Sequence, residues 1–224
     1  MDITSKLRSM ADLEYLDFSK KIVNSSYELL GVRLPVLRKL AKELSKTDAY
    51  DEFADKPKTF YEEVLLHGIL AGLRKGTPKE HIRDAERFLS ETDSWGQTDS
   101  AITGWKWIAK DPDAYRDWMK NLLNDDREFY RRTGILISMR YYPGKEDTEE
   151  TVKSFAKGGS DGYYVKMMMA WYLAERAVLY PEYVLEYLGK EIPDPWTANK
   201  AIQKIRESYR FSKEYKQMAE ELKR

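Results

Sequence analysis

Cysteine is absent from the 224-residue sequence, and histidine occurs only twice. Without cysteine the chain forms no disulfide bond and offers no thiolate to a metal, which is typical of an intracellular protein. The two histidines, His67 and His81, belong to different predicted helices, and Glu63 precedes His67 by four residues instead of the three of the di-metal bundle motif. We therefore expect no metal site.

Long apolar runs are also missing from the sequence. No stretch of about eighteen apolar residues occurs, and the first ten residues lack the apolar core of a signal peptide. We therefore expect a cytoplasmic protein without membrane contact, nucleoid-associated if its source is prokaryotic. Phosphate-binding loops, dinucleotide fingerprints, nucleophile elbows and kinase signatures are absent as well, which excludes the common nucleotide-dependent and acyl-transfer enzymes.

The formal net charge is zero, because 38 lysines and arginines balance 38 aspartates and glutamates. The chain as a whole therefore has no electrostatic attraction for nucleic acid. Any affinity for DNA must come from local segregation of the basic residues onto one surface.

Helix signals recur from one end of the chain to the other. Residues 34–44 combine an early proline with apolar residues three and four apart, and residues 61–73 repeat that spacing. Thr77-Pro78-Lys79-Glu80 is typical of a capping box and predicts a helix to about Leu89. Further helices are predicted at about 95–109, 112–123, 126–142, 148–156, 163–179, 181–188, 195–208 and 213–223.

These predicted helices are roughly ten to sixteen residues long and follow one another through short connections, while no stretch alternates at period two. The pattern predicts an all-α fold, a curved α-solenoid of HEAT-like antiparallel helical hairpins. We expect residues 1–224 to form a single domain. The glycine-rich stretch 157–162 is the most flexible connection, and we interpret it as a loop between repeats.

Five segments, spread over about four fifths of the chain, carry a resemblance to a known family. They are Leu30-Gly31-Val32-Arg33-Leu34-Pro35 with Leu37-Arg38-Lys39-Leu40, Trp95-Gly96-Gln97-Thr98-Asp99, Tyr130-Arg131-Arg132 leading into Ile135-Leu136, the stretch from Lys166 to Trp171, and the stretch from Asn199 to Arg210. In order and separation they resemble the DNA alkylation repair proteins, the AlkD-like alkylpurine DNA glycosylases. That resemblance implies hydrolysis of the N-glycosidic bond of cationic N3- or N7-alkylpurines in duplex DNA, with no metal and no cofactor.

The resemblance also implies roles for individual residues. The family's active-site aspartate falls on Asp99, its two aromatic neighbours on Trp95 and Trp171, and its cleft arginine on Arg132, with Arg131 as the competing assignment. We expect these side chains to face one solvent-accessible cleft. The motif departs from the best-understood enzymes in having Gly96-Gln97-Thr98 between the tryptophan and the acid.

The implied chemistry is consistent with the residue types. A cationic alkylpurine is already a good leaving group, so one carboxylate that stabilises the developing positive charge on the sugar suffices. Asp99 lies four residues after Trp95, hence on the same helical face. The alternatives are that Asp99 only bonds to a neighbouring helix, and that Arg132 pairs with an acid between repeats instead of holding a phosphate.

Basic residues predicted to bind DNA lie in three places: Arg33, Arg38 and Lys39 near a helix N-terminus, Arg131, and Lys200, Lys204, Arg206 and Arg210 near the C-terminus. The alternative for the C-terminal group is a solvated helix face, because Glu207 interrupts it. Trp105, Trp107, Trp118 and Trp196 are predicted to pack in the core.

A second class of function remains open on the sequence. A non-catalytic HEAT-like-repeat scaffold could bind nucleic acid or protein on its concave face, and fold alone does not separate it from an enzyme. We expect a monomer in either case.

Overall fold

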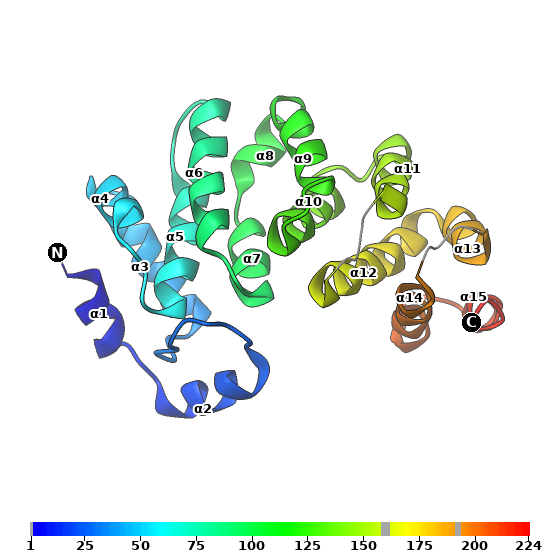
Figure 1. Ribbon diagram of the computed structural model, residues 1–224, viewed down its shortest axis with the longest axis horizontal. Helices are drawn as coiled ribbons and strands as arrows, with labels where there is room; N and C mark the ends of the chain where they lie inside the picture. Colours follow the sequence, from blue (N-terminus) through cyan, green and yellow to red (C-terminus); the bar gives the residue numbers. More distant parts are fainter. Residues whose placement is uncertain (1, 158–161, 191–193) are drawn as a thin grey trace. The chain divides into compact units, whose positions relative to one another are not determined.

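The structure is a computed structural model that describes residues 2–157, 162–190 and 194–224 (Figure 1). Every regular element in these residues is a helix, and one isolated bridge joins Glu28 to Phe60. The predicted all-α fold is therefore confirmed. The glycine-rich connection predicted at 157–162 falls at 158–161 outside the described residues. No helix in the described part of the chain has the length and apolar character needed to cross a membrane.

The chain divides into two compact units, Met1–Tyr115 and Arg116–Arg224, called unit 1 and unit 2 below. Unit 1 contains α1 (Ile3–Ser9), α2 (Leu13–Ile22), α3 (Leu34–Leu44), α4 (Ala49–Asp55), α5 (Tyr61–Leu73), α6 (Pro78–Glu91), α7 (Trp95–Ile102), α8 (Lys106–Lys110) and the 3₁₀ turn η1 (Asp113–Tyr115). Helix α5 is the centre of the unit, because α3, α4, α6 and α7 all pack against it and it is buried from Tyr61 to Ala71.

Unit 2 contains α9 (Arg116–Leu123), α10 (Glu128–Tyr141), α11 (Lys145–Ser154), the 3₁₀ turn η2 (Phe155–Lys157), α12 (Tyr163–Leu179), α13 (Pro181–Lys190), α14 (Pro195–Glu207) and α15 (Lys213–Glu220). Helix α10 packs against α9, α11 and α12, and α12 packs against α13 and α14. The two central helices, α10 and α12, are buried along most of their length.

Most predicted helix bounds agree with the structure to within a few residues, and those of α3, α5 and α12 agree at both ends. The capping box is confirmed, since Thr77 caps α6 and Glu80 reaches back to the backbone of Thr77. The single helix predicted at 95–109 is wrong. It divides into α7 and α8 because the side chain of Trp105 turns into the core, where its indole donates to the carbonyl of Gly68 at 2.9 Å. Helices α1, α2 and α4 were not predicted from the sequence.

A buried carboxylate connects the loop before α3 to the central helix of unit 1. Glu62 on α5 is 3% exposed, and its oxygens accept the backbone N–H groups of Leu30 at 2.9 Å, Gly31 at 2.7 Å and Val32 at 3.2 Å. Gly31 has a φ of 82°, the left-handed region that favours glycine. A charged acceptor for three backbone donors offsets the cost of burying Glu62 and fixes where α3 begins.

Replacing Glu62 by Gln should therefore destabilise the protein. The amide keeps one acceptor oxygen but turns an N–H₂ group toward backbone donors, so the midpoint of urea unfolding should fall by an amount equivalent to about 2 kcal/mol. The exposed Glu14→Gln on α2 is the matched control and should leave the midpoint within about 0.5 kcal/mol of wild type. Equal midpoints for the two variants would show that the buried carboxylate is not needed.

Candidate functional site

Helix α7 has one buried face and one half-exposed face. Gly96, Gln97 and Thr98 are buried, whereas Trp95 and Asp99 are half-buried. Because Trp95 and Asp99 are four residues apart on a helix, they lie on the same side of it. The structure thus presents the predicted acid and its predicted aromatic neighbour together, on the part of α7 that solvent reaches.

The buried face of α7 explains the residues between the tryptophan and the acid. A side-chain carbon at Gly96 would overlap the hydroxyl of Tyr61 on α5, so glycine permits the close approach of the two helices. The side chain of Gln97 accepts the backbone N–H of Asp93 at 3.1 Å and donates to the carbonyl of Tyr61 at 3.5 Å. Both residues hold α7 in one orientation on α5.

The carboxylate of Asp99 has a partner within its own helix. The hydroxyl of Thr98 has two acceptors for its one proton, Asp99 Oδ1 at 3.1 Å and the backbone carbonyl of Trp95 at 3.0 Å. The first turn of α7 is in turn held by Asp93, which accepts from the side chains of Ser25 and Ser26. A half-buried, ionisable carboxylate on a fixed short helix can stabilise positive charge that develops beside it.

In unit 2 the two adjacent arginines of α10 point to different neighbours. Arg131 is 6% exposed and donates to the carbonyl of Ser154 at 2.9 Å, at the end of α11. Arg132 is 4% exposed and donates to the carbonyl of Tyr164 at 2.8 Å, in the first turn of α12. The alternative for Arg132, an acidic partner between repeats, stays a prediction. The placement of Arg131 favours a structural role over the DNA contact predicted for it.

Arg132 also lies close to basic residues of α14. Burial lowers the pKa of Lys204, and the nearby positive charges of Lys200 and Arg132 lower it further, whereas Glu207 opposes the shift. Lys200 donates to the side chain of Gln203 at 2.9 Å. Arg132, which is buried, and Lys200 and Lys204, which are half-buried, thus form a group of cations from two helices, the Arg132–Lys200–Lys204 cluster, whose mutual repulsion an anion would relieve.

Trp171 on α12 is half-buried and lines a surface groove of about 500 Å³ in unit 2. Its indole N–H donates to Glu175 at 3.3 Å, one helical turn later. Glu175 in turn accepts two bonds from the guanidinium of Arg210, at 2.6 and 2.9 Å. Sequence reasoning identified Trp171 and missed Glu175, although the spacing of four residues on a helix was a signal for that contact.

Several other cations predicted to bind DNA have acidic partners. Arg33 pairs with Asp12 at 2.8 Å, and Arg206 pairs with Glu220 at 3.3 Å. All three guanidinium nitrogens of Arg210 have acceptors within the chain, two on Glu175 and one on Ser208. Arg38 and Lys39 are exposed on α3. Arg206 and Arg210 are therefore engaged within the protein, whereas Lys200 and Lys204 lie near Arg132.

The tryptophans predicted to pack in the core do so in three of four cases. Trp105, Trp107 and Trp118 are at most 7% exposed, which confirms the prediction for them. Trp196 is 39% exposed, so the prediction is wrong for that residue. It lies in the first turn of α14 at the surface, where its ring centre is 5.7 Å from that of Tyr163.

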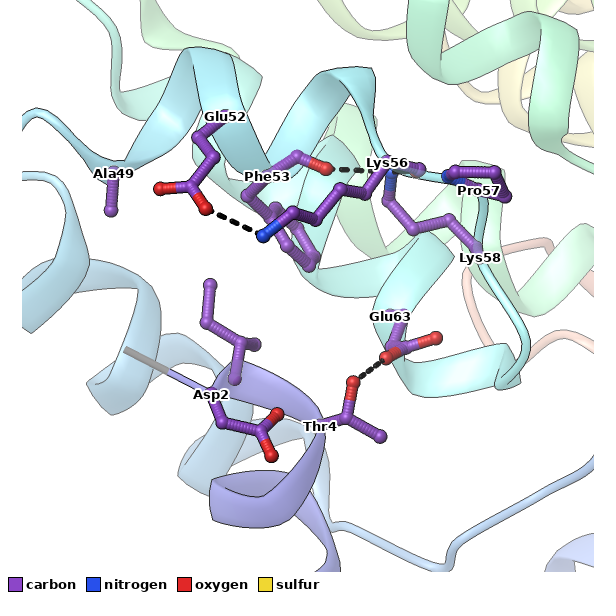
Figure 2. A pocket seen from close by; sticks show the side chains of 10 residues that line it. Asp2, Thr4, Ala49, Glu52, Phe53, Lys56, Pro57, Lys58 and Glu63 are labelled. Carbon is purple, nitrogen blue, oxygen red and sulfur yellow. Dashed lines mark hydrogen bonds and ion pairs between the residues drawn. The ribbon is translucent and has the colours of Figure 1, made fainter.

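A cavity of about 120 Å³ beside α1 in unit 1 contains none of the predicted site residues (Figure 2). Its charged groups are bound to one another or to the backbone: Glu63 accepts from Thr4, Lys56 donates to Glu52, and Lys58 donates to the carbonyl of Phe53 (Figure 2). The bond between Thr4 and Glu63 joins α1 to α5, while the other two bonds lie at the C-terminal end of α4.

The two histidines occupy separate buried positions in unit 1. His67 lies between Tyr50, at 3.3 Å, and Glu91, at 2.8 Å, and burial lowers its pKa. His81 bonds to Tyr115 at 2.7 Å and stacks on Trp107 with ring centres 4.8 Å apart. Both imidazoles therefore serve the packing of aromatic side chains.

The chain matches the model of a known protein family. A family model described as DNA alkylation repair enzyme matches residues 3–205, which confirms the resemblance seen in the sequence. The matched region includes Trp95, Asp99, Arg132 and Trp171 and ends before Arg206 and Arg210. Searches of curated proteins and of solved structures each gave no match.

The contact between α5 and α7 generates a prediction for Gly96. Gly96→Ala should lower stability by about 1–3 kcal/mol, because the methyl group overlaps the buried hydroxyl of Tyr61. Tyr61→Phe removes that oxygen, so the double variant should regain most of the loss. A double-mutant cycle measured by urea unfolding checks this, and purely additive effects of the two substitutions would contradict it.

Proposed function

The chain belongs to the DNA alkylation repair enzyme family, and from this membership we propose that it is a DNA glycosylase acting on cationic N3- or N7-alkylpurines in duplex DNA. The observation that carries the proposal is the half-exposed face of α7, on which Trp95 and Asp99 lie while the three residues between them are buried. The single domain and the α-solenoid of HEAT-like hairpins predicted from the sequence remain part of this proposal.

In the proposed reaction the bond between the sugar carbon C1′ and the alkylated nitrogen breaks. Its electron pair leaves with the base and neutralises the positive charge of that base, so no general acid is required. The charge that develops on the sugar is stabilised by the carboxylate of Asp99, which also orients a water molecule. The water oxygen then bonds to C1′, and the proton that it loses passes to solvent.

The two tryptophans supply surfaces suited to a cationic substrate. An indole ring attracts positive charge through its face, and a half-buried indole keeps part of that face available. Trp95 does this next to Asp99 on α7, and Trp171 offers a second such surface in unit 2.

The Arg132–Lys200–Lys204 cluster fits the phosphate backbone of DNA. Cations of like charge held together gain from an anion that neutralises them, and phosphate oxygens accept such charge-assisted hydrogen bonds. The lowered pKa of Lys204 supports this assignment because its causes include the neighbouring charges of Lys200 and Arg132. Contacts of this kind position the protein on DNA without reading sequence.

Replacing Asp99 by Asn tests the chemistry. The amide keeps the shape of the side chain and loses the negative charge, so release of 7-methylguanine or 3-methyladenine should fall by at least about 100-fold while DNA affinity and folding stay near wild type. The measurement is single-turnover base release from methylated duplex DNA, together with DNA titration and a melting curve.

A matched control for Asp99→Asn is Asp126→Asn, the same change at an exposed position of unit 2, which should leave base release unchanged. An Asp99→Asn protein as active as wild type would remove Asp99 from the mechanism. A wild-type protein that binds duplex DNA but releases no base would favour the non-catalytic scaffold.

The cation cluster leads to a separate prediction about salt. Binding of duplex DNA should weaken with added salt, and Lys204→Met should reduce the slope of log K against log salt by about 1, the contribution of one phosphate contact. Lys145→Met, at an exposed position that begins α11, is the control and should leave the slope unchanged. Equal slopes for Lys204→Met and wild type would exclude a phosphate contact at Lys204.

A further inference from the structure

The ring nitrogen of Trp171 bonds to a side chain that also binds an arginine. Its indole N–H donates to Glu175 Oε1, and the same oxygen accepts from Arg210 at 2.6 Å while the other oxygen accepts from that guanidinium at 2.9 Å. Glu175 therefore joins a half-exposed tryptophan to a cation that follows α14.

The geometry restricts the indole. Trp171 and Glu175 are one turn apart on α12, and Trp171, Glu175 and Arg210 all line the same groove. A carboxylate whose two oxygens both accept from one arginine keeps one orientation, because the planar guanidinium forms two parallel hydrogen bonds with the planar carboxylate. A fixed carboxylate in turn fixes the ring whose N–H it accepts.

We propose that Glu175 and Arg210 are positioning residues that hold the indole of Trp171 in the orientation used for DNA. This inference rests on the proposed function for its biological meaning, and on the hydrogen bonds for its structure. It gives Arg210 a role other than phosphate binding, and it extends the site past residue 205, where the match to the family ends. Arg210 acts through Glu175 and does not itself contact the reacting atoms.

The direction of the pKa shift agrees with the geometry. The pKa of Glu175 lies below its usual value, chiefly because Arg210 bonds to its charged form, and the indole N–H adds to the effect. A carboxyl with a lowered pKa keeps its bonds above its ordinary titration range and loses them as the pH falls through the lowered value. The orientation of Trp171 should follow the same titration.

Nuclear magnetic resonance of the indole N–H groups tests the positioning directly. The chain has six tryptophans, and Trp171→Phe identifies the resonance of interest. That resonance should shift on acidification with a midpoint below the ordinary glutamate pKa. It should also shift at neutral pH in Arg210→Met, and it should lose its pH dependence in Glu175→Gln. An unchanged resonance in Arg210→Met would overturn the proposal.

Kinetics test whether the fixed indole matters for the reaction. Arg210→Met should lower the single-turnover rate of base release about 5–20-fold with less than a twofold change in DNA affinity, and Arg210→Lys should recover part of the rate. Lys213→Met, an exposed cation at the start of α15, is the control and should match wild type. A rate unchanged by Arg210→Met, or a loss explained by unfolding in a melting curve, would overturn the role in positioning.

The two readouts separate this inference from the proposed function. If the wild-type protein releases no base, the glycosylase proposal fails, while the resonance of Trp171 still decides whether Glu175 and Arg210 hold the ring. If base release requires Asp99 but the Trp171 resonance is unchanged in Arg210→Met, the glycosylase proposal stands. The proposal that Glu175 and Arg210 position Trp171 is then wrong.

Discussion

The close approach of α7 to α5 is the contact on which the candidate site of unit 1 depends. A helix of eight residues is not stable alone, so its orientation comes from tertiary packing. Gly96 permits the close approach of the two helices at the hydroxyl of Tyr61. The side chain of Gln97 bonds to the backbone of Asp93, before α7, and of Tyr61, on α5. A side chain at position 96 would overlap the hydroxyl of Tyr61, so either α7 or Tyr61 would have to shift. The placement of Asp99 therefore depends on Gly96, a residue that takes no part in the proposed reaction.

Buried cations have a comparable part in unit 2, where they bind the backbone at the ends of helices. Arg176 is 2% exposed, and one of its nitrogens donates to the carbonyls of Ser138, Met139 and Tyr142 at the end of α10. Arg131 does the same for Ser154. The carbonyl groups at a helix C-terminus lack partners within the helix, and a guanidinium satisfies several of them at once. Several basic residues of this neutral chain are therefore engaged within the protein, Arg131 and Arg176 among them.

Local pattern was enough to predict α3, α5, α6 and α12, because α3, α5 and α12 have apolar residues at helical spacing and α6 begins with a capping box at Thr77. Local pattern was not enough where tertiary contacts determine a helix boundary, a side-chain partner or the burial of a residue. The break after α7 results from the bond between Trp105 and Gly68, which lies 37 residues earlier in the chain. Arg131 and Arg132 are adjacent and of the same type, so the sequence does not distinguish their roles. In the structure Arg131 bonds to the end of α11 and Arg132 to the start of α12. Trp196 lies in the first turn of α14 and is exposed, although a large apolar side chain is usually expected in the core.

The difference between a core tryptophan and a functional one lies in what fixes the ring. Trp105 is fixed by complete burial, so no face is left for a ligand. A half-exposed indole keeps a face available but has rotational freedom, and a ligand that orders the ring must offset the lost entropy. The attraction of a cation to an aromatic ring also depends on meeting the ring by its face. Hydrogen bonding of Trp171 to Glu175 holds the polar edge of a half-buried indole that lines the groove, which lowers the rotational freedom of the ring before a ligand binds. Since Glu175 is itself held by Arg210, the segment after α14 contributes to the orientation of an aromatic side chain on α12.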